Sequence, residues 1–125
     1  MQPINKLMML QLAVTDMVAA KKFYTEALGL KITTEYRQDD ANWWTSVELP
    51  EGNVTITLST HHDHMKPGTA TLYFGSSDVE ATHKELKDKG IVVSDILDDL
   101  HGPGSKVKFF TLKDADNNLI HIEQA

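Results

Sequence analysis

Two stretches of the chain, "LMMLQLAVTDMVAAKKFYTEALGLKI" (7–32) and "GTATLYFGSSDVEATHKELKDKGIVV" (68–93), decide how the fold is interpreted. Each contains a strand-like segment, then an Asp, an amphipathic segment and a Gly. Asp78 follows Asp16 by 62 residues, which is about half of the 125-residue chain. This spacing indicates an internal repeat.

Each stretch also carries signals for both ends of a helix. The short carboxylates of Asp16 and Asp78 can accept hydrogen bonds from the free N–H groups of a first helical turn. Gly29 and Gly90, which lie 61 residues apart, suit the left-handed residue that ends a helix. Apolar side chains between these signals recur at helical spacing. We therefore predict one helix in each half.

Three further strands are expected after each helix. They are "LKITTEYR" (30–37), "NWWTSVEL" (42–49) and "NVTITLS" (53–59) in the first half, and "IVVSDIL" (91–97), "SKVKFFTL" (105–112) and "NLIHIEQ" (118–124) in the second. The order predicts an α+β fold of two βαβββ modules within a single domain that spans residues 1–125. The modules cover about 5–60 and 68–125, and a linker at 61–67 joins them.

The composition excludes several classes of function. The formal net charge is −6 and the basic residues are scattered, which argues against binding to nucleic acid. The absence of cysteine excludes disulfides, thiolate catalysis and cysteine-based metal sites. Gln11 interrupts the N-terminal apolar run, which is too short for a signal peptide or a membrane span. We expect a cytoplasmic protein that binds neither nucleic acid nor membranes.

Two segments, "LQLAVTDMVAAKKFYTEALGLKI" (10–32) and "FFTLKDADNNLIHIEQ" (109–124), resemble the opening and closing signatures of the vicinal oxygen chelate superfamily. Its members include glyoxalase I, extradiol dioxygenases, fosfomycin-resistance enzymes and bleomycin-resistance proteins. The resemblance implies a curved, mainly antiparallel eight-stranded sheet around a ligand cleft, with the helices on the outer side, usually in a homodimer. It specifies the fold better than the activity, because one scaffold hosts many functions.

Alternate residues along the predicted strands form an apolar set and a mixed set. In the first strand Leu10, Leu12 and Val14 share one face, and Gln11 is on the other. Three other strands show the same division. We expect the apolar set to face the helices and the mixed set to line the cleft. A mixed face that is simply exposed to solvent is the alternative that alternation leaves open.

The resemblance implies four metal-ligand positions, usually occupied by His and Glu. In this chain they carry Met9, Thr57, Thr71 and His121. A thioether and two hydroxyls are poor ligands for Zn, Ni, Fe or Mn, and a single imidazole binds such ions too weakly to retain them. We therefore predict no metal and no cofactor. His121 is interpreted either as a hydrogen-bonding group of the pocket or as a satisfied structural histidine.

The segment "THHDHM" (60–65) contains three of the six histidines of the chain. It falls in the linker region, away from the implied ligand positions, and is predicted to be a solvated loop. In an extended conformation His62 and His64 would point to the same side. Adventitious binding of Ni, Cu or Zn therefore stays an alternative.

Trp43 and Trp44 are adjacent, so on a strand they must face opposite sides. Alternation places Trp44 and Glu48 in the mixed set, where a Trp and an acid suit a flat or cationic ligand. A packing or dimer-contact role for Trp44 is the alternative. The predicted ligand-binding residues are Met9, Gln11, Trp44, Glu48, Thr57, Thr71, Tyr73, Phe109 and His121.

These observations favour a homodimeric, metal-free protein that binds a small molecule, similar to bleomycin-resistance proteins that sequester a cationic drug. No catalytic residue is assigned. One alternative is a glyoxalase- or dioxygenase-like enzyme, a lyase, isomerase or oxygenase with an atypical metal-ligand set. An enzyme of the same fold without a metal would use His121 and Glu48 as acid–base groups. A third possibility is an interaction module whose cleft holds no ligand.

Overall fold

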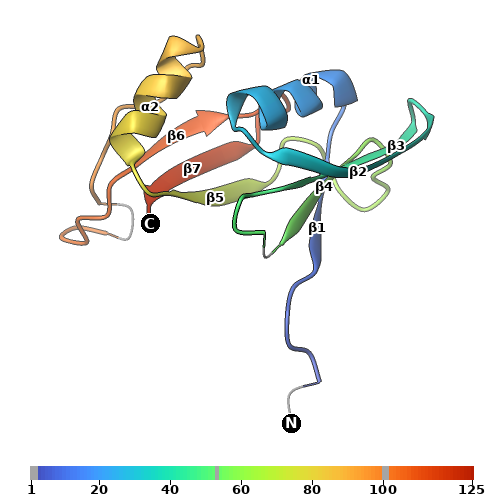
Figure 1. The fold of residues 1–125 in the computed structure, drawn as a ribbon, viewed down its shortest axis with the longest axis horizontal. Helices are drawn as coiled ribbons and strands as arrows, with labels where there is room; N and C mark the ends of the chain where they lie inside the picture. The colour runs from blue at the N-terminus through green and yellow to red at the C-terminus, as the bar shows by residue number, and fades with distance from the viewer. Residues whose placement is uncertain (1–2, 53, 100–101) are drawn as a thin grey trace. The chain divides into compact units, whose positions relative to one another are not determined.

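The computed structural model describes residues 3–52, 54–99 and 102–125 (Figure 1). The chain divides into two compact units, with the boundary between Pro67 and Gly68. Across the described residues, no helix has the length and apolar character needed to cross a membrane.

The first unit is a four-stranded sheet with one helical segment. Its elements are β1 (Met9–Ala13), α1 (Met17–Lys22), the π-helical turn η1 (Phe23–Ala27), β2 (Lys31–Asp39), β3 (Asn42–Glu48) and β4 (Thr55–Ser59). The strand order is β1-β4-β3-β2. β1 runs parallel to β4, and the other neighbours are antiparallel.

The second unit repeats this plan with a three-stranded sheet. Its elements are β5 (Thr71–Ser76), α2 (Val79–Asp88), β6 (Phe109–Lys113) and β7 (Leu119–Gln124). The strand order is β5-β7-β6, and β5 is parallel to β7. In both units the first strand therefore pairs in parallel with the last strand, as expected of a repeated module.

The predicted ends of both helices are confirmed. The Asp16 carboxylate accepts a hydrogen bond from the backbone N–H three residues later at 3.1 Å, and the Asp78 carboxylate does the same at 3.0 Å. Gly29 and Gly90 have φ angles of 76° and 81°, in the left-handed region that a residue without a Cβ adopts at least cost.

The prediction of eight strands is not confirmed, because the described residues form seven. Residues 91–97 run beside β6, but only Leu97 and Phe109 form a bridge. The cause lies at Ser94, whose hydroxyl accepts the Thr111 N–H at 2.8 Å in place of a backbone carbonyl. The Ser94 carbonyl instead lies 2.8 Å from Nε2 of His83 on α2.

The predicted strand 105–112 also begins later than expected. β6 starts at Phe109. Lys106 has a φ of 61°, and this left-handed conformation is incompatible with a continuous strand. The strand is therefore confirmed only over its second half.

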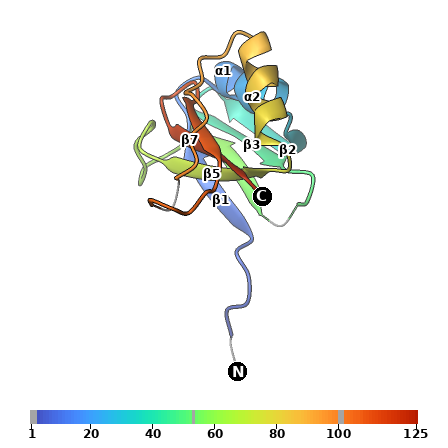
Figure 2. The same cartoon turned by 90° about the vertical axis from the view of Figure 1, so that its left-hand side faces the viewer.

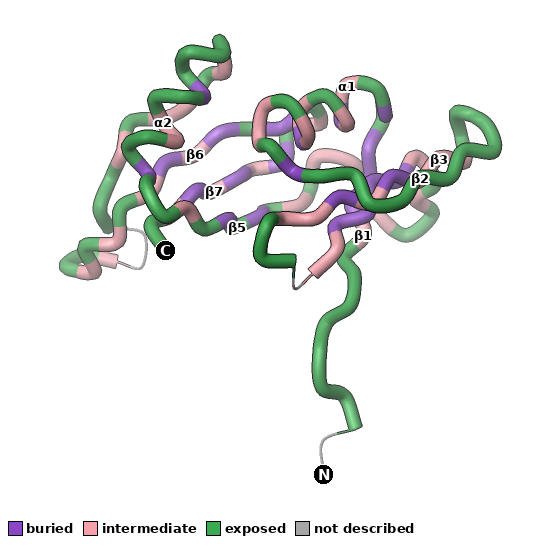
Figure 3. The backbone as a smooth tube through the Cα atoms, viewed as in Figure 1, coloured by how far each residue is buried: buried purple, intermediate pink, exposed green. Residues whose placement is uncertain are grey.

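The apolar and mixed sets separate as alternation predicts on β3 and in the second unit, but β4 is buried on both faces, including Thr57 and Ser59. Along β5, buried residues alternate with exposed ones (Figure 3). The buried apolar side chains on the strands are Leu12, Ala13, Val47, Ile56 and Leu58 in the first unit, and Leu72, Phe74, Phe110, Leu112, Ile120 and Ile122 in the second. α1 contacts β4, and α2 contacts β6 and β7. Each unit therefore has its own core between sheet and helix.

Leu10 departs from this pattern. Although alternation places Leu10 in the apolar set, 43% of its surface is exposed. It lies on β1, an edge strand of the first sheet. Figures 1 and 2 both show the chain before β1 leading away from that sheet.

Candidate functional site

A group of aromatic rings lies on the mixed face of the second sheet. The register places Tyr73, His121 and Thr111 side by side across β5, β7 and β6. The rings of Tyr73 and His121 stack at 4.3 Å between centroids with a 12° tilt. The Phe109 ring is stacked with the same imidazole at 5.8 Å. Tyr73 is 57% exposed, so this stack forms part of the surface of the second unit.

The imidazole of His121 has an unusual environment. Its Nδ1 atom is buried and has no hydrogen-bond partner among the described residues. Buried polar atoms are nearly always paired, and an unpaired one costs about 1–3 kcal/mol. A satisfied structural histidine, one of the two interpretations of the sequence, does not fit this geometry.

An open pocket of about 550 Å³ lies on the same unit, and no residue of the stack lines it. It lies between residues 91–94 and the neighbouring parts of β6 and β7, and includes Thr111, Lys113 and Leu119. Thr111 pairs directly with His121 in the sheet register. The volume is within the range of about 300–1,000 Å³ that is usual for small-molecule sites.

A second aromatic group, Tyr36, Trp44 and His61, lies on the first unit. The ring centroids of Tyr36 and Trp44 are 5.4 Å apart, and those of Trp44 and His61 are 6.1 Å apart. Only Trp44 belongs to the predicted set. Two signals in the sequence point to the others. Tyr36 is the residue that pairs with Trp44 in the β2–β3 hairpin. His61 lies two residues after Ser59, the last residue of β4, and so continues its alternation.

The carbonyl of His61 is held in place by two side chains. It accepts hydrogen bonds from Gln11 Nε2 at 3.1 Å and from Ser59 Oγ at 2.7 Å. The predicted loop is present, but its first histidine contacts the sheet. The extended conformation considered for the loop is not found, because it turns where the Met65 N–H meets the His62 carbonyl at 3.5 Å.

A row of polar side chains crosses the same face. Gln11, Thr57 and Ser46 are neighbours on β1, β4 and β3, and the hydroxyls of Ser46 and Thr57 lie 2.9 Å apart. Glu48 accepts a hydrogen bond of 3.4 Å from Thr55, which pairs with Met9.

The predicted residues therefore form two groups, one on each unit. The structure brings Met9, Gln11, Trp44, Glu48 and Thr57 to one face of the first sheet. It brings Thr71, Tyr73, Phe109 and His121 to one face of the second.

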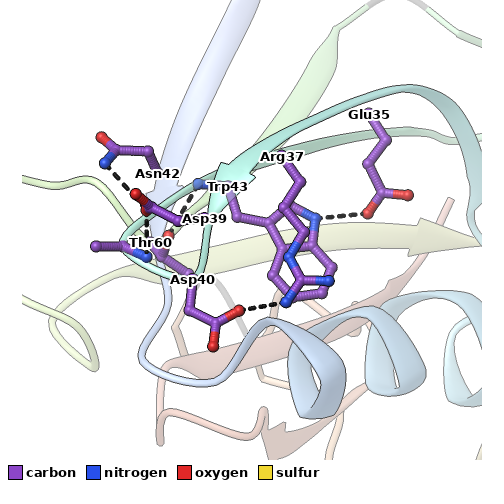
Figure 4. A network of polar contacts seen from close by, with 8 residues as sticks. Glu35, Arg37, Asp39, Asp40, Asn42, Trp43 and Thr60 are labelled. Carbon is purple, nitrogen blue, oxygen red and sulfur yellow. Dashed lines mark hydrogen bonds and ion pairs between the residues drawn. The ribbon is translucent and has the colours of Figure 1, made fainter.

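A third cluster, on the helix side of the first sheet, was not predicted; Figure 4 shows three of its residues, Glu35, Arg37 and Trp43. One oxygen of Glu35 accepts hydrogen bonds from Lys21 Nζ and Trp43 Nε1, both at 2.7 Å, and from Thr45 Oγ1 at 2.8 Å. The Arg37 guanidinium lies 4.3 Å from the centre of the Trp43 ring. We call these five residues the Glu35 cluster.

The Glu35 carboxylate is stabilised as an anion. Partial burial opposes its ionisation, but the hydrogen bonds from Lys21, Thr45 and Trp43 outweigh this effect and lower its pKa below the ordinary value of 4.5. The sequence gives no signal for this cluster, because Lys21 reaches Glu35 only when α1 packs on the sheet.

The family is established by comparison with known proteins. The family model described as the Glyoxalase/Bleomycin resistance protein/Dioxygenase superfamily matches residues 5–122. The chain belongs to this superfamily.

Relatives of this superfamily member cover nearly its whole length. It is 29% identical to the protein YraH of Bacillus subtilis (strain 168) over an alignment of 126 positions. The alignment covers 94% of this chain and 96% of YraH. The structure of TnmS3, an antibiotic binding protein from Streptomyces sp. CB03234, has a TM-score of 0.84 and 22% identity, and the similarity covers 99% of this chain and 98% of TnmS3. A superfamily member from Sphaerobacter thermophilus DSM 20745 has a TM-score of 0.79 and 19% identity, with 98% of each chain covered.

The residues at the metal positions implied by the superfamily do not fit a divalent cation. The Thr57 hydroxyl is buried and already bonded to Ser46. His121 lies against aromatic rings, without the carboxylate or carbonyl that usually orients a metal-bound imidazole. Throughout residues 3–52, 54–99 and 102–125, no three His, Asp or Glu side chains come together as a metal site.

Proposed function

We propose that this superfamily member is a metal-free, cytoplasmic protein that binds and sequesters a flat aromatic or cationic small molecule. One observation carries the proposal: the buried Nδ1 of His121 has no partner among the described residues and lies in a stack with Tyr73 and Phe109. An aromatic ligand with a hydrogen-bonding group would extend the stack and satisfy the imidazole nitrogen.

Three further observations support this function. The stack is partly exposed, and Thr111, which pairs with His121, lines a pocket of suitable size. The structure of TnmS3, which is described as an antibiotic binding protein, has the same fold. The donors at Met9, Thr57 and Thr71 are thioether and hydroxyl groups, which favour organic recognition over coordination of an ion. The lack of cysteine is consistent with a cytoplasmic location.

The ligand proposal is tested by thermal unfolding with a panel of planar cationic aromatic compounds, followed by calorimetric titration of any that bind. A ligand at one hundred times its Kd should stabilise the fold by about 2.7 kcal/mol, which raises the Tm by about 8–16 °C. Tyr73→Ala should remove most of this effect.

Two results would contradict the proposal. One is the absence of stabilisation by every compound in the panel. The other is near-stoichiometric Ni, Zn, Fe or Mn in protein purified without a histidine tag, lost in His121→Ala. The second result would support the metal-dependent enzyme instead.

The proposal includes a homodimer, which an exposed apolar strand supports. β1 is an edge strand with β4 as its neighbour. Apolar side chains on and before this strand are exposed, namely Ile4, Leu7, Met8, Met9 and Leu10. Edge strands and apolar patches of this kind are usually covered.

Light scattering after size exclusion should give twice the chain mass of 14.0 kDa. Leu7→Lys should shift the protein towards the monomer, whereas Val92→Lys, which changes an exposed apolar residue of the other unit, should not. A wild-type mass of one chain at tens of micromolar would refute the dimer.

A further inference from the structure

The aromatic group of the first unit is attached to a poorly buried part of the sheet. All nine residues of β2 are exposed, including Tyr36 at 57%. Burial in the core therefore does not hold this strand. Its position depends on pairing with β3 and on side-chain contacts, and without such contacts an exposed hairpin fluctuates readily.

The Glu35 cluster supplies these contacts from the helix side, and Figure 4 shows the one between Trp43 and Glu35. One carboxylate oxygen of Glu35 joins three elements, since its donors are Lys21 on α1 and Trp43 and Thr45 on β3. The backbone of Trp43 is tied in turn to Thr60, whose hydroxyl accepts the Trp43 N–H and whose N–H donates to the Trp43 carbonyl, both at 3.1 Å.

The residues of this network and of the aromatic group are neighbours along the chain. They form three pairs of consecutive residues, namely Glu35 with Tyr36, Trp43 with Trp44, and Thr60 with His61. Successive residues of a strand point to opposite faces, which applies to the first two pairs; Thr60 and His61 directly follow β4. The backbone fixed by the first member of each of the first two pairs therefore sets the position of the second member on the other face.

We propose that Glu35 is a positioning residue, which fixes the aromatic group of Tyr36, Trp44 and His61 from the opposite side of the sheet. Its role in ligand recognition rests on the proposed function and on contact of the ligand with Trp44, which the sequence predicts. Its role in ordering Trp44 does not depend on any ligand.

The test uses 19F NMR of protein labelled with 5-fluorotryptophan. The two tryptophans of the chain give two signals. The signal that is lost in Trp44→Phe belongs to Trp44. Glu35→Gln keeps the shape of the side chain but removes its charge. We expect it to shift or broaden the Trp44 signal in the folded protein. Lys21→Met, which removes one of the three donors, should produce a smaller change in the same direction.

Glu80→Gln is the matched control. Glu80 forms an ion pair of 2.6 Å with Lys108 in the second unit, so its substitution removes a similar Glu–Lys contact without touching the aromatic group. Both tryptophan signals should stay unchanged in this variant. If Glu35→Gln and Lys21→Met lower the stability but leave the Trp44 signal unmoved, Glu35 is merely structural and the proposal is overturned.

Binding of 9-aminoacridine, followed by its fluorescence, separates this inference from the proposed function. We expect Glu35→Gln to weaken binding by about three- to tenfold and Glu80→Gln to leave it unchanged. If wild-type protein does not bind this probe but the Trp44 signal still responds to Glu35→Gln, the positioning role stands. Equal binding by wild type and Glu35→Gln would show that Glu35 does not act on recognition.

Discussion

His121→Phe should make the ligand-free protein more stable, by about 1–2 kcal/mol, while weakening ligand binding at least tenfold. The buried Nδ1 of His121 has no partner among the described residues, and removing an unpaired buried polar atom recovers its desolvation cost. A phenyl ring keeps the stacking with Tyr73 and Phe109. It offers no hydrogen bond to a ligand. Urea unfolding measures the first effect and calorimetric titration the second.

The same substitution at His83 is the control. Nε2 of His83 is hydrogen-bonded to the Ser94 carbonyl at 2.8 Å, and its ring packs edge-on against Phe110 at 4.9 Å. His83→Phe removes a satisfied contact and should cost about 1–2 kcal/mol. A His121→Phe variant that is also destabilised would show that Nδ1 is satisfied in solution, and the main argument for the ligand site would fail.

Asn118→Asp should destabilise the protein by about 3 kcal/mol at pH 7. Asn118 is 1% exposed. Its amide donates to Asp114 Oδ2 at 2.8 Å and accepts the Ala70 N–H at 2.9 Å, which ties the start of β5 to the turn before β7. The substitution would place two carboxylates in contact in a buried site. Loss of a bond to a charged group and repulsion between like charges both oppose folding.

This cost should depend on pH. Repulsion raises the folded-state pKa of one carboxyl above its unfolded value of about 4. The folded variant then holds more protons than the unfolded chain, so its stability rises as the pH falls through the raised pKa. The difference from wild type, measured by urea unfolding between pH 3.5 and 7, should therefore shrink towards acid.

Asn117→Asp introduces the same charge at the exposed neighbouring position. Asn117 has a φ of 68°, which Asp also tolerates. We expect a change below about 0.5 kcal/mol. Similar costs at both positions would mean that the contact between Asn118 and Asp114 is unimportant.

The sequence predicted those features of the candidate site that depend on strand parity. Trp44 and Trp43 take opposite faces, as expected. His121 and Tyr73 share a face because each lies at an alternate position of its own strand. Tyr36 and His61 were missed because one depends on the register of a hairpin and the other on how far the alternation of β4 continues into a loop.

By itself the sequence determined the repeat, both helix caps, the glycines that end the helices and the division of the strands into apolar and mixed faces. These features arise from residues close together in the chain, where spacing and side-chain chemistry decide the outcome. Only the tertiary structure decided that Ser94 interrupts an eighth strand, that Lys21 reaches Glu35 and that His121 Nδ1 is left unpaired. Each depends on atoms from elements distant in sequence, and their meeting is set by packing.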